Sequence, residues 1–318
     1  MPDQCQLTVL MAVYNEHRFV RTCIDSMLAQ TYSDFRFLIV DDASTDDTRE
    51  IIHSYDDPRI ELVCLEQNVG QTGALNAGLR QTVTPWIARM DADDFSAPTR
   101  LEKQMKVLDA DPSLSCVGTW GWTFREEPEV YEGAVTPPED YEAILHRLLW
   151  STPIIHGTMI ASTKAMLDVG AYDDQYRYAA DIEMYDRLLA KYTAINIPEK
   201  LLGIRYHDGQ GQRTMRALQE IIDIHSRRLE SGRYSRADAG IIRNCLSRQH
   251  IVLGRQLAGK GRLGGLLNSL TLALRLSPKT FFPHLVTIFL GYAVPERHRT
   301  RLKRSLQRIL SPVKATSN

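Results

Sequence analysis

The first hundred residues alternate between short apolar segments and amphipathic stretches, and this alternation constrains the fold more than any other feature of the chain. Four apolar segments of strand length lie at 7–13, 35–40, 60–65 and 86–90. Between them, apolar residues recur at helical spacing. Strands that alternate with helices through short connections are typical of a parallel sheet covered on both faces.

The remainder of the chain has a different texture. The segment 115–206 is mixed, with strands predicted at 116–122 and 202–206 and a strand, or a loop leading into a strand, at 154–161. Only helical spacing follows, and the predicted helices span 213–229, 236–257, 266–276, 281–293 and 298–310. A stretch rich in Gly and Gln near 208–214 marks the expected boundary between a domain at 1–212 and a helical region at 213–318.

Polar residues gather where three of the first four strands end. Tyr14, Asn15 and Glu16 follow the first strand, with Asn15 as the expected N-cap of a helix over 16–30. Two further clusters are Asp41-Asp42 after the second strand and Asp91 to Asp94 after the fourth. Because ligands of such sheets bind beyond the carboxyl ends of the strands, we expect one site at this edge.

The last cluster, DADD, places three carboxylates within four positions, where they repel one another unless a cation lies among them. Mg²⁺ and Mn²⁺ prefer oxygen ligands, commonly one or two carboxylates with phosphate oxygens and water. No G-x-G-x-x-G follows a predicted strand, and no GxxxxGK[ST] occurs, so a dinucleotide site and a P-loop are both unsupported. A cation that holds a diphosphate is therefore favoured; the alternative is a solvated turn in which Asp94 or Ser96 caps the next helix.

Four segments in order resemble the nucleotide-sugar-binding half of the family 2 glycosyltransferases: LTVLMAVYNE, QTYSDFRFLIVDDASTDDT, NVGQTGALNAGL and WIARMDADD. The resemblance covers about residues 7–206. It implies an α/β GT-A fold, a Rossmann-like mixed sheet flanked by helices, with a helical C-terminal extension. It also implies a nucleotide-diphosphate sugar as donor and Mn²⁺ or Mg²⁺ as cofactor.

The resemblance implies roles for individual residues. Those implied to bind the sugar nucleotide are Ala12, Tyr14, Glu16, Asp41, Asp42, Asp91 and Asp93. Those implied to hold the metal are Asp93, Asp94 and His207. Asp181 takes the position of the general base, and the acceptor side is assigned to His156, Trp120 and Glu183. Ala180 stands where the family has a glutamate before this aspartate, so one acidic group is missing.

Each of these residues also has a simpler structural interpretation. The Asp41-Asp42 pair suits an Asx turn, and Asp181 suits a helix N-cap. A histidine in an apolar strand, such as His156, is often a hydrogen-bonded core residue, and Trp120 is readily explained by packing. Tyr14 stacks on a flat base or packs on the sheet edge.

The implied mechanism is a single displacement with inversion, because one carboxylate base faces the leaving diphosphate across the anomeric carbon. The expected donor is a UDP-sugar, and the expected acceptor is a hydroxyl group of a glycan or lipid-linked precursor. Two alternatives stay open. One is a nucleotidyltransferase that makes sugar nucleotides, and the other is a catalytically degenerate sugar-nucleotide-binding scaffold at a membrane, which the missing glutamate favours.

The net charge of −1 hides a strong asymmetry along the chain. Residues 1–212 carry 18 Lys and Arg against 34 Asp and Glu, whereas residues 213–318 carry 20 against 5. The predicted helix 298–310 has one apolar stripe flanked by basic residues, which favours an anionic membrane surface. The alternative is packing on the acidic domain; no nucleic-acid module is recognised. We therefore expect a cytoplasmic protein bound peripherally at the inner face of the plasma membrane.

Overall fold

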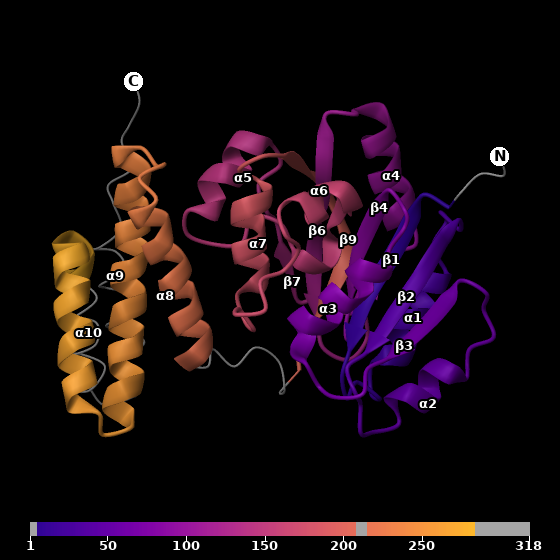
Figure 1. Ribbon diagram of the computed structural model, residues 1–318, viewed down its shortest axis with the longest axis horizontal. Helices are drawn as coiled ribbons and strands as arrows, with labels where there is room; N and C mark the ends of the chain where they lie inside the picture. The colour runs from indigo at the N-terminus through magenta and orange to yellow at the C-terminus, as the bar shows by residue number, and fades with distance from the viewer. Residues whose placement is uncertain (1–4, 208–214, 284–318) are drawn as a thin grey trace. The chain divides into compact units, whose positions relative to one another are not determined.

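The computed structural model describes residues 5–207 and 215–283, and the chain divides into two compact units, residues 1–212 and 213–318 (Figure 1). The strands of the first unit are β1 Leu7–Val13, β2 Phe35–Asp41, β3 Ile60–Cys64, β4 Trp86–Asp91, β5 Phe95–Ser96, β6 Leu114–Phe124, β7 Gly133–Val135, β8 Ile160–Ser162 and β9 Thr193–Arg205. Its helices are α1 Val20–Leu28, α2 Thr48–His53, α3 Gly70–Gln81, α4 Arg100–Ala110, α5 Tyr141–Leu148, the 3-10 turn η1 His156–Thr158, α6 Thr163–Asp168 and α7 Ala180–Leu188.

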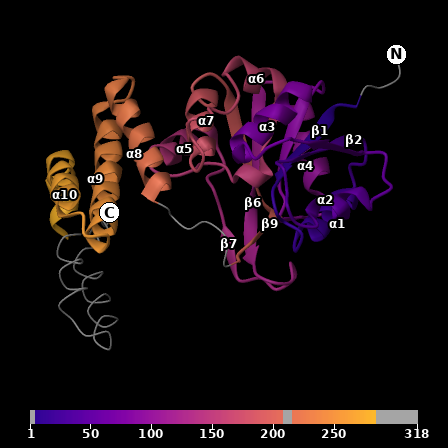
Figure 2. The same cartoon turned by 60° about the horizontal axis from the view of Figure 1, so that its bottom comes forward.

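All these strands belong to one mixed sheet with the order β3-β2-β1-β4-β8-β6-β9-β5. The first four strands along the chain are mutually parallel, as the sequence predicts. The later strands change direction, because β8 runs antiparallel to both β4 and β6, while β6 and β9 are parallel. Strand β7 lies off this path and pairs antiparallel with β6 (Figure 2). The expected α/β class with a mixed sheet is confirmed.

Two apolar cores lie on the two faces of the sheet. Successive side chains along each strand point to opposite faces and so contribute to both cores. In β1, Leu7, Val9 and Met11 enter one core, whereas Leu10 enters the other. Helices α1, α2 and α4 cover the first face. Helices α3, α5, α6 and α7 cover the second face. The strands are therefore buried on both sides, and only their ends are available for a site.

One local prediction is wrong, and for a second the structure selects the loop-strand alternative. Asn15 does not cap a helix, because α1 begins only at Val20; Asn15 instead adopts a positive φ of 55° and accepts a hydrogen bond from the Thr45 backbone N–H at 2.8 Å. The predicted strand 154–161 is interrupted by η1, and only Ile160–Ser162 pairs in the sheet. Apolar spacing alone does not separate a buried strand from a buried turn.

The second unit contains helices α8 Met215–Glu230, α9 Arg236–Gly259 and α10 Leu263–Leu276. Helix α9 packs against both of the others, and the Ser247 hydroxyl on α9 donates to the Ala273 carbonyl on α10 at 2.9 Å. A G-x-G-x-x-G at 259–264 joins two helices here and follows no strand. Within the described ranges, no helix has the length and apolar content needed to cross a bilayer. The predicted helix 298–310, and most of 281–293, lie outside the described residues.

Candidate active site

A polar cavity of the first unit has a volume of about 400 Å³ and lies at the carboxyl ends of β1 and β4. The three polar clusters predicted from the sequence all contribute to its wall. The predicted residues that line it are Ala12, Tyr14, Glu16, Asp42, Asp91, Asp93, Asp94 and His156. Sequence reasoning therefore located the cavity, although not the orientation of each side chain.

A second cavity of about 200 Å³ is lined by Asp181, Tyr172 and Arg177. It shares Gln71, Asp91 and His156 with the larger cavity, so these three residues stand at the junction between the two. The candidate base and the acidic cluster consequently face a pair of adjoining hollows. Such an arrangement suits two substrates that must meet at one reacting bond.

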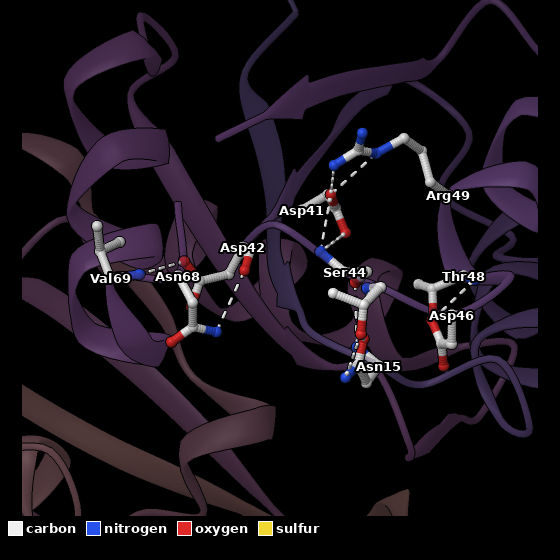
Figure 3. Close-up of polar contacts among 10 residues, drawn as sticks. Asn15, Asp41, Asp42, Ser44, Asp46, Thr48, Arg49, Asn68 and Val69 are labelled. Atoms are coloured by element: carbon white, nitrogen blue, oxygen red, sulfur yellow. Dashed lines mark hydrogen bonds and ion pairs between the residues drawn. The ribbon is translucent and has the colours of Figure 1, made fainter. Parts of the chain in front are cut away.

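The two neighbouring aspartates after β2 have different surroundings (Figure 3). The carboxylate of Asp42 accepts the backbone N–H groups of Val69 at 2.7 Å and Gly70 at 2.8 Å, at the N-terminus of α3. Gly70 has a φ of +83°, which a side chain would disfavour. Asp42 thus ties α3 to the sheet while forming part of the cavity wall.

Asp41 turns away from the cavity. Its side chain is buried, and its Oδ2 accepts from Arg49 Nη2 at 2.6 Å and Nε at 3.1 Å (Figure 3). It also accepts the Ser44 backbone N–H, as the turn interpretation requires. The implied nucleotide contact of Asp41 is therefore not supported. Its carboxylate is hydrogen-bonded to Ser44 and Arg49 and does not line either described cavity.

Residues of the loop after β1 form the rim of the larger cavity. Tyr14 is 43% exposed, so one face of its ring is open to a planar ligand. Burial, followed by the nearby carboxylates of Asp93, Asp46 and Asp91, raises the pKa of Glu16 to about 7. Near neutral pH this carboxyl group is therefore divided between its charged and its protonated form.

Asp91 is held by a buried cation. Arg89, 1% exposed in the middle of β4, donates from Nη2 to Asp91 Oδ1 at 2.6 Å, and Gln71 Nε2 donates to the same oxygen at 3.2 Å. Burial works to raise the pKa of Asp91, but the charge and hydrogen bond of Arg89 outweigh it, and the pKa is lowered. Part of the repulsion within DADD is thus relieved by a residue of the chain itself.

The other two carboxylates of DADD point in different directions. Asp93 Oδ2 lies 3.2 Å from His207 Nε2, and Asp94 Oδ1 accepts the backbone N–H of Arg205 at 3.0 Å. The Arg205 guanidinium stacks between the rings of Phe19 and Phe124. Burial and the adjacent aspartates raise the pKa of Asp93 and, more strongly, that of Asp94.

The predicted metal ligands Asp93, Asp94 and His207 do not assemble as a set. Among residues 5–207 and 215–283, no three His, Cys, Asp or Glu side chains surround one point as ligands would. The reason is that Asp94 turns toward β9, whereas Asp93 turns toward the histidine ring. The alternative in which Asp94 or Ser96 caps the next helix is not supported either, because the N-cap of α4 is Thr99 and no side chain caps it.

The residues present nevertheless fit a hard divalent cation that takes its other ligands from a diphosphate and water. Asp93 and Asp94 both line the larger cavity, and Asp94 Oδ2 accepts no hydrogen bond within the described part of the chain. This oxygen lies near Gly157, since a Cβ built there would be 3.4 Å from it. Two carboxylates facing one cavity suffice for Mg²⁺ or Mn²⁺ only when phosphate oxygens complete the shell.

Asp181 lies in the first turn of α7 and lines the smaller cavity. Its Oδ2 accepts from the Thr152 hydroxyl at 3.3 Å, and the N-cap of α7 is Ala179, so Asp181 is not a capping residue. Burial raises its pKa above the usual range of an aspartate. A carboxylate that is partly desolvated in a cavity is a stronger base than one in water.

His156 stands between the two cavities, and its Nε2 lies 2.7 Å from the Tyr172 hydroxyl. Burial, assisted by the neighbouring Arg89 charge, lowers the pKa of His156 to about 3. The ring is therefore neutral over the physiological range. A neutral imidazole paired with a phenol provides hydrogen bonds to a ligand without adding charge.

Two predicted acceptor-side residues do not reach either described cavity. The indole N–H of Trp120 donates to the Pro137 carbonyl at 2.9 Å. The Glu183 carboxylate pairs with Arg187, one helical turn away on α7, at 2.5 Å. Both assignments to the acceptor side are thus unsupported, because these polar groups are engaged within the fold.

Arginines are the residues that sequence reasoning missed. Arg100, fully buried at the start of α4, donates to the Gly157 carbonyl at 2.9 Å and to the Arg89 carbonyl at 2.8 Å. Arg89 itself breaks an otherwise apolar strand, WIARMD, and a lone cation at such a position is a usable signal. Sequence spacing did not identify the contact of Arg100 with Gly157, which lies 57 positions further along the chain, whereas Arg89 and Asp91 are two residues apart on one face of β4.

The comparisons with known proteins agree with this architecture. The family model described as Glycosyl transferase family 2 matches residues 8–170. The putative glycosyltransferase EpsE of Bacillus subtilis is 31% identical over 206 residues, which is 63% of this chain and 73% of that protein. The O-antigen biosynthesis glycosyltransferase WbnJ of Escherichia coli is 32% identical over 224 residues, 67% of this chain and 85% of that protein.

Solved structures with the same fold include S. aureus TarS 1-349 in complex with UDP-GlcNAc, with a TM-score of 0.66, 15% identity, and coverage of 95% of this chain and 90% of that one. The chain spans only 50% of the longer TarS chain. The mannosyltransferase PcManGT from Pyrobaculum calidifontis, in complex with GDP-Man and Mn²⁺, has a TM-score of 0.59 at 20% identity and covers 97% of this chain and 88% of that one. These structures show the fold alone, which is GT-A.

The matched segment contains β1 to β4 and the acidic cluster that follows them, together with the turn that carries His156. These are the elements that form the larger cavity. The geometry, the family model and the bacterial relatives lead to one conclusion: the chain belongs to glycosyl transferase family 2.

Proposed function

We propose that the protein is an inverting glycosyltransferase that moves a hexosyl group from a UDP-sugar to a hydroxyl group of a glycan or lipid-linked acceptor. The observation that carries the proposal is the junction of the two cavities at Asp91 and His156. One cavity is lined by the residues implied to bind the nucleotide, and the other by the candidate base Asp181. A glycosyl group placed at the junction would face both.

The roles of the chain's own residues follow from their places. Tyr14 offers a ring to the base, and Ala12 leaves room beside it. Asp91 accepts hydroxyl groups at the junction. Asp181 accepts the proton of the attacking acceptor hydroxyl group, and the neutral His156 orients it. Because Asp181 lies in the second cavity, it approaches from the side opposite the diphosphate, as inversion requires.

The proposed cofactor is Mn²⁺ or Mg²⁺, held by Asp94 with Asp93 beside it, which leaves Asp91 to the glycosyl group. When bound, such a cation neutralises the charge that grows on the departing diphosphate. The mannosyltransferase PcManGT was solved with Mn²⁺, which supports this choice by fold. The same fold has also been solved with UDP-GlcNAc in TarS, which supports a sugar nucleotide as donor.

The test is a calorimetric titration of the purified protein with UDP-, GDP- and dTDP-sugars, with Mn²⁺ or with EDTA. We expect one class of donor to bind, and the affinity to fall at least about tenfold in EDTA, since the diphosphate then meets uncompensated carboxylates. A transfer assay follows with the donor that binds. Absence of binding across the panel would contradict the proposal, and binding without transfer or hydrolysis would favour the degenerate scaffold.

We further propose that residues 213–318 bring the protein to an anionic membrane surface. In the described part, α10 exposes Leu263 and Leu267 beside Arg262. The predicted helix 298–310 adds basic residues, each worth about 1 kcal/mol near such a surface. At that surface the enzyme would encounter a lipid-linked acceptor.

Vesicle flotation tests this second proposal. The full chain should float with vesicles containing phosphatidylserine and not with phosphatidylcholine alone. Replacing Arg301, Lys303 and Arg304 with Gln should weaken binding about a hundredfold. The matched control replaces Lys106, Lys164 and Lys191, which are exposed lysines of the first unit. Equal flotation of both triple variants would contradict membrane binding through the C-terminal region.

A further inference from the structure

Arg89 is a buried arginine on β4, a central strand of the sheet, and it precedes Asp91 of the acidic cluster by two residues. Its side chain is 1% exposed, and its Nη2 donates to Asp91 Oδ1 at 2.6 Å. Its Nε and Nη1 have no hydrogen-bond partner among the described residues. Burying a guanidinium with two unpaired N–H groups disfavours folding, so stability alone does not explain an arginine here.

The effect of this ion pair on Asp91 is to separate the functions of its two oxygens. Asp91 Oδ1 accepts hydrogen bonds from two side chains. One donor is Arg89, and the other is Gln71 of helix α3, at 3.2 Å. Oδ2 receives none within the described residues and lies close to Gly157. A carboxylate fixed at one oxygen presents the other in a defined direction, which lowers the entropic cost of binding a hydroxyl group.

The carboxylate that carries this free oxygen lies at the junction of the two cavities. Asp91 lines both hollows, together with Gln71 and His156. Gly157 leaves this space open, since a Cβ there would lie 3.2 Å from Asp91 Oδ2 and 2.9 Å from a methyl group of Leu202. A glycosyl group that passes from a nucleotide in the larger cavity to an acceptor in the smaller one must lie at this junction.

We propose that Arg89 is a positioning residue, which orients Asp91 so that its Oδ2 accepts hydroxyl groups of the glycosyl moiety of the sugar nucleotide. This inference rests on the proposed function. Arg89 itself touches no ligand, because its side chain is buried and lines neither described cavity. It acts only through the carboxylate.

The decisive measurement compares two ligands in the Arg89→Met variant by calorimetry. The sugar nucleotide that binds the wild type should bind at least about tenfold more weakly, which is the usual cost of losing a hydrogen bond to a charged group. The corresponding nucleoside diphosphate, which lacks the glycosyl moiety, should change less than about twofold. Arg89→Lys, which retains a cation beside Asp91, should lie between the wild type and Arg89→Met for the sugar nucleotide only.

A double-mutant cycle with Asp91→Asn tests the route of the effect. If Arg89 acts through Asp91, replacing Arg89 in the Asp91→Asn protein should change the sugar-nucleotide affinity less than about twofold, so that the two losses are not additive. The double variant contains no unpaired buried charge, and it therefore remains informative if Arg89→Met alone does not fold. Additive losses would overturn the inference.

An equal loss of affinity for the sugar nucleotide and the nucleoside diphosphate would also overturn it, because a general distortion of the site weakens both. The two proposals fail in different ways. Absence of sugar-nucleotide binding by the wild type contradicts the proposed function. Normal binding by the wild type with equal or additive losses in the variants contradicts only the role of Arg89.

Discussion

Replacing Asp181 with Asn should lower the rate of glycosyl transfer by about a hundredfold to ten thousandfold and leave donor affinity within about twofold. A positioned general base contributes a factor of this size, and an amide has the shape of the carboxylate but cannot accept the proton. Asp181 lines only the smaller cavity, so the donor should bind normally. Initial rates and calorimetric donor affinity, measured on the same preparations, separate the two effects.

The matched control for this variant is Asp186→Asn, on the same helix and outside both described cavities. Its rate should stay within about twofold of the wild type. The pH profile gives a second check, because burial raises the pKa of Asp181 and only its deprotonated form is a base. Transfer should therefore decline as the pH falls through a value above that of a free aspartate. An Asp181→Asn protein with full activity would remove this residue from the mechanism.

Replacing Asp42 with Ala should lower the free energy of unfolding by about 2 kcal/mol and weaken donor binding at the same time. The carboxylate accepts the backbone N–H groups of Val69 and Gly70, and its loss leaves both donors unpaired at the N-terminus of α3. The same helix carries Gln71 at the junction of the cavities, so its displacement should reach the donor site. Urea unfolding and calorimetry measure the two consequences.

Asp47→Ala is the control for this second prediction. Asp47 directly precedes α2 in the chain, but it is exposed and makes no side-chain capping bond. Its replacement should change stability by less than about 0.5 kcal/mol. If Asp42→Ala were as stable as this control and lost only donor affinity, Asp42 would be a ligand contact with no role in anchoring α3.

Several features of the fold and the site were accessible from the sequence. The alternation of Leu7, Val9 and Met11 with Leu10 determines the two faces of β1, and the helical spacing between strands determines that both faces are covered. This pattern is local, so it can be read without knowledge of the fold. The rule that ligands bind at the carboxyl ends of parallel strands then placed Tyr14, Asp42 and the DADD cluster at one edge.

The direction of each side chain within the site was not accessible. Asp41 and Asp42 are adjacent, yet one pairs with Arg49 and the other with the start of α3. Trp120 and Glu183 have the residue types expected of an acceptor wall, but neither lines a described cavity. Spacing along the chain indicates which end of the sheet a residue occupies, and it carries no information on which distant group pairs with its side chain.

The sequence by itself determined the layers of the first unit, the edge that holds the site and the acidic character of that site. Only the tertiary structure decided that Asp42 accepts from the start of α3, that Asp94 faces Arg205, and that the cavity of Asp181 adjoins the larger one. The physical reason is the range of the interactions. Hydrophobic periodicity acts between neighbours in the chain, whereas these hydrogen bonds and the cavity walls are assembled from segments that meet only after folding.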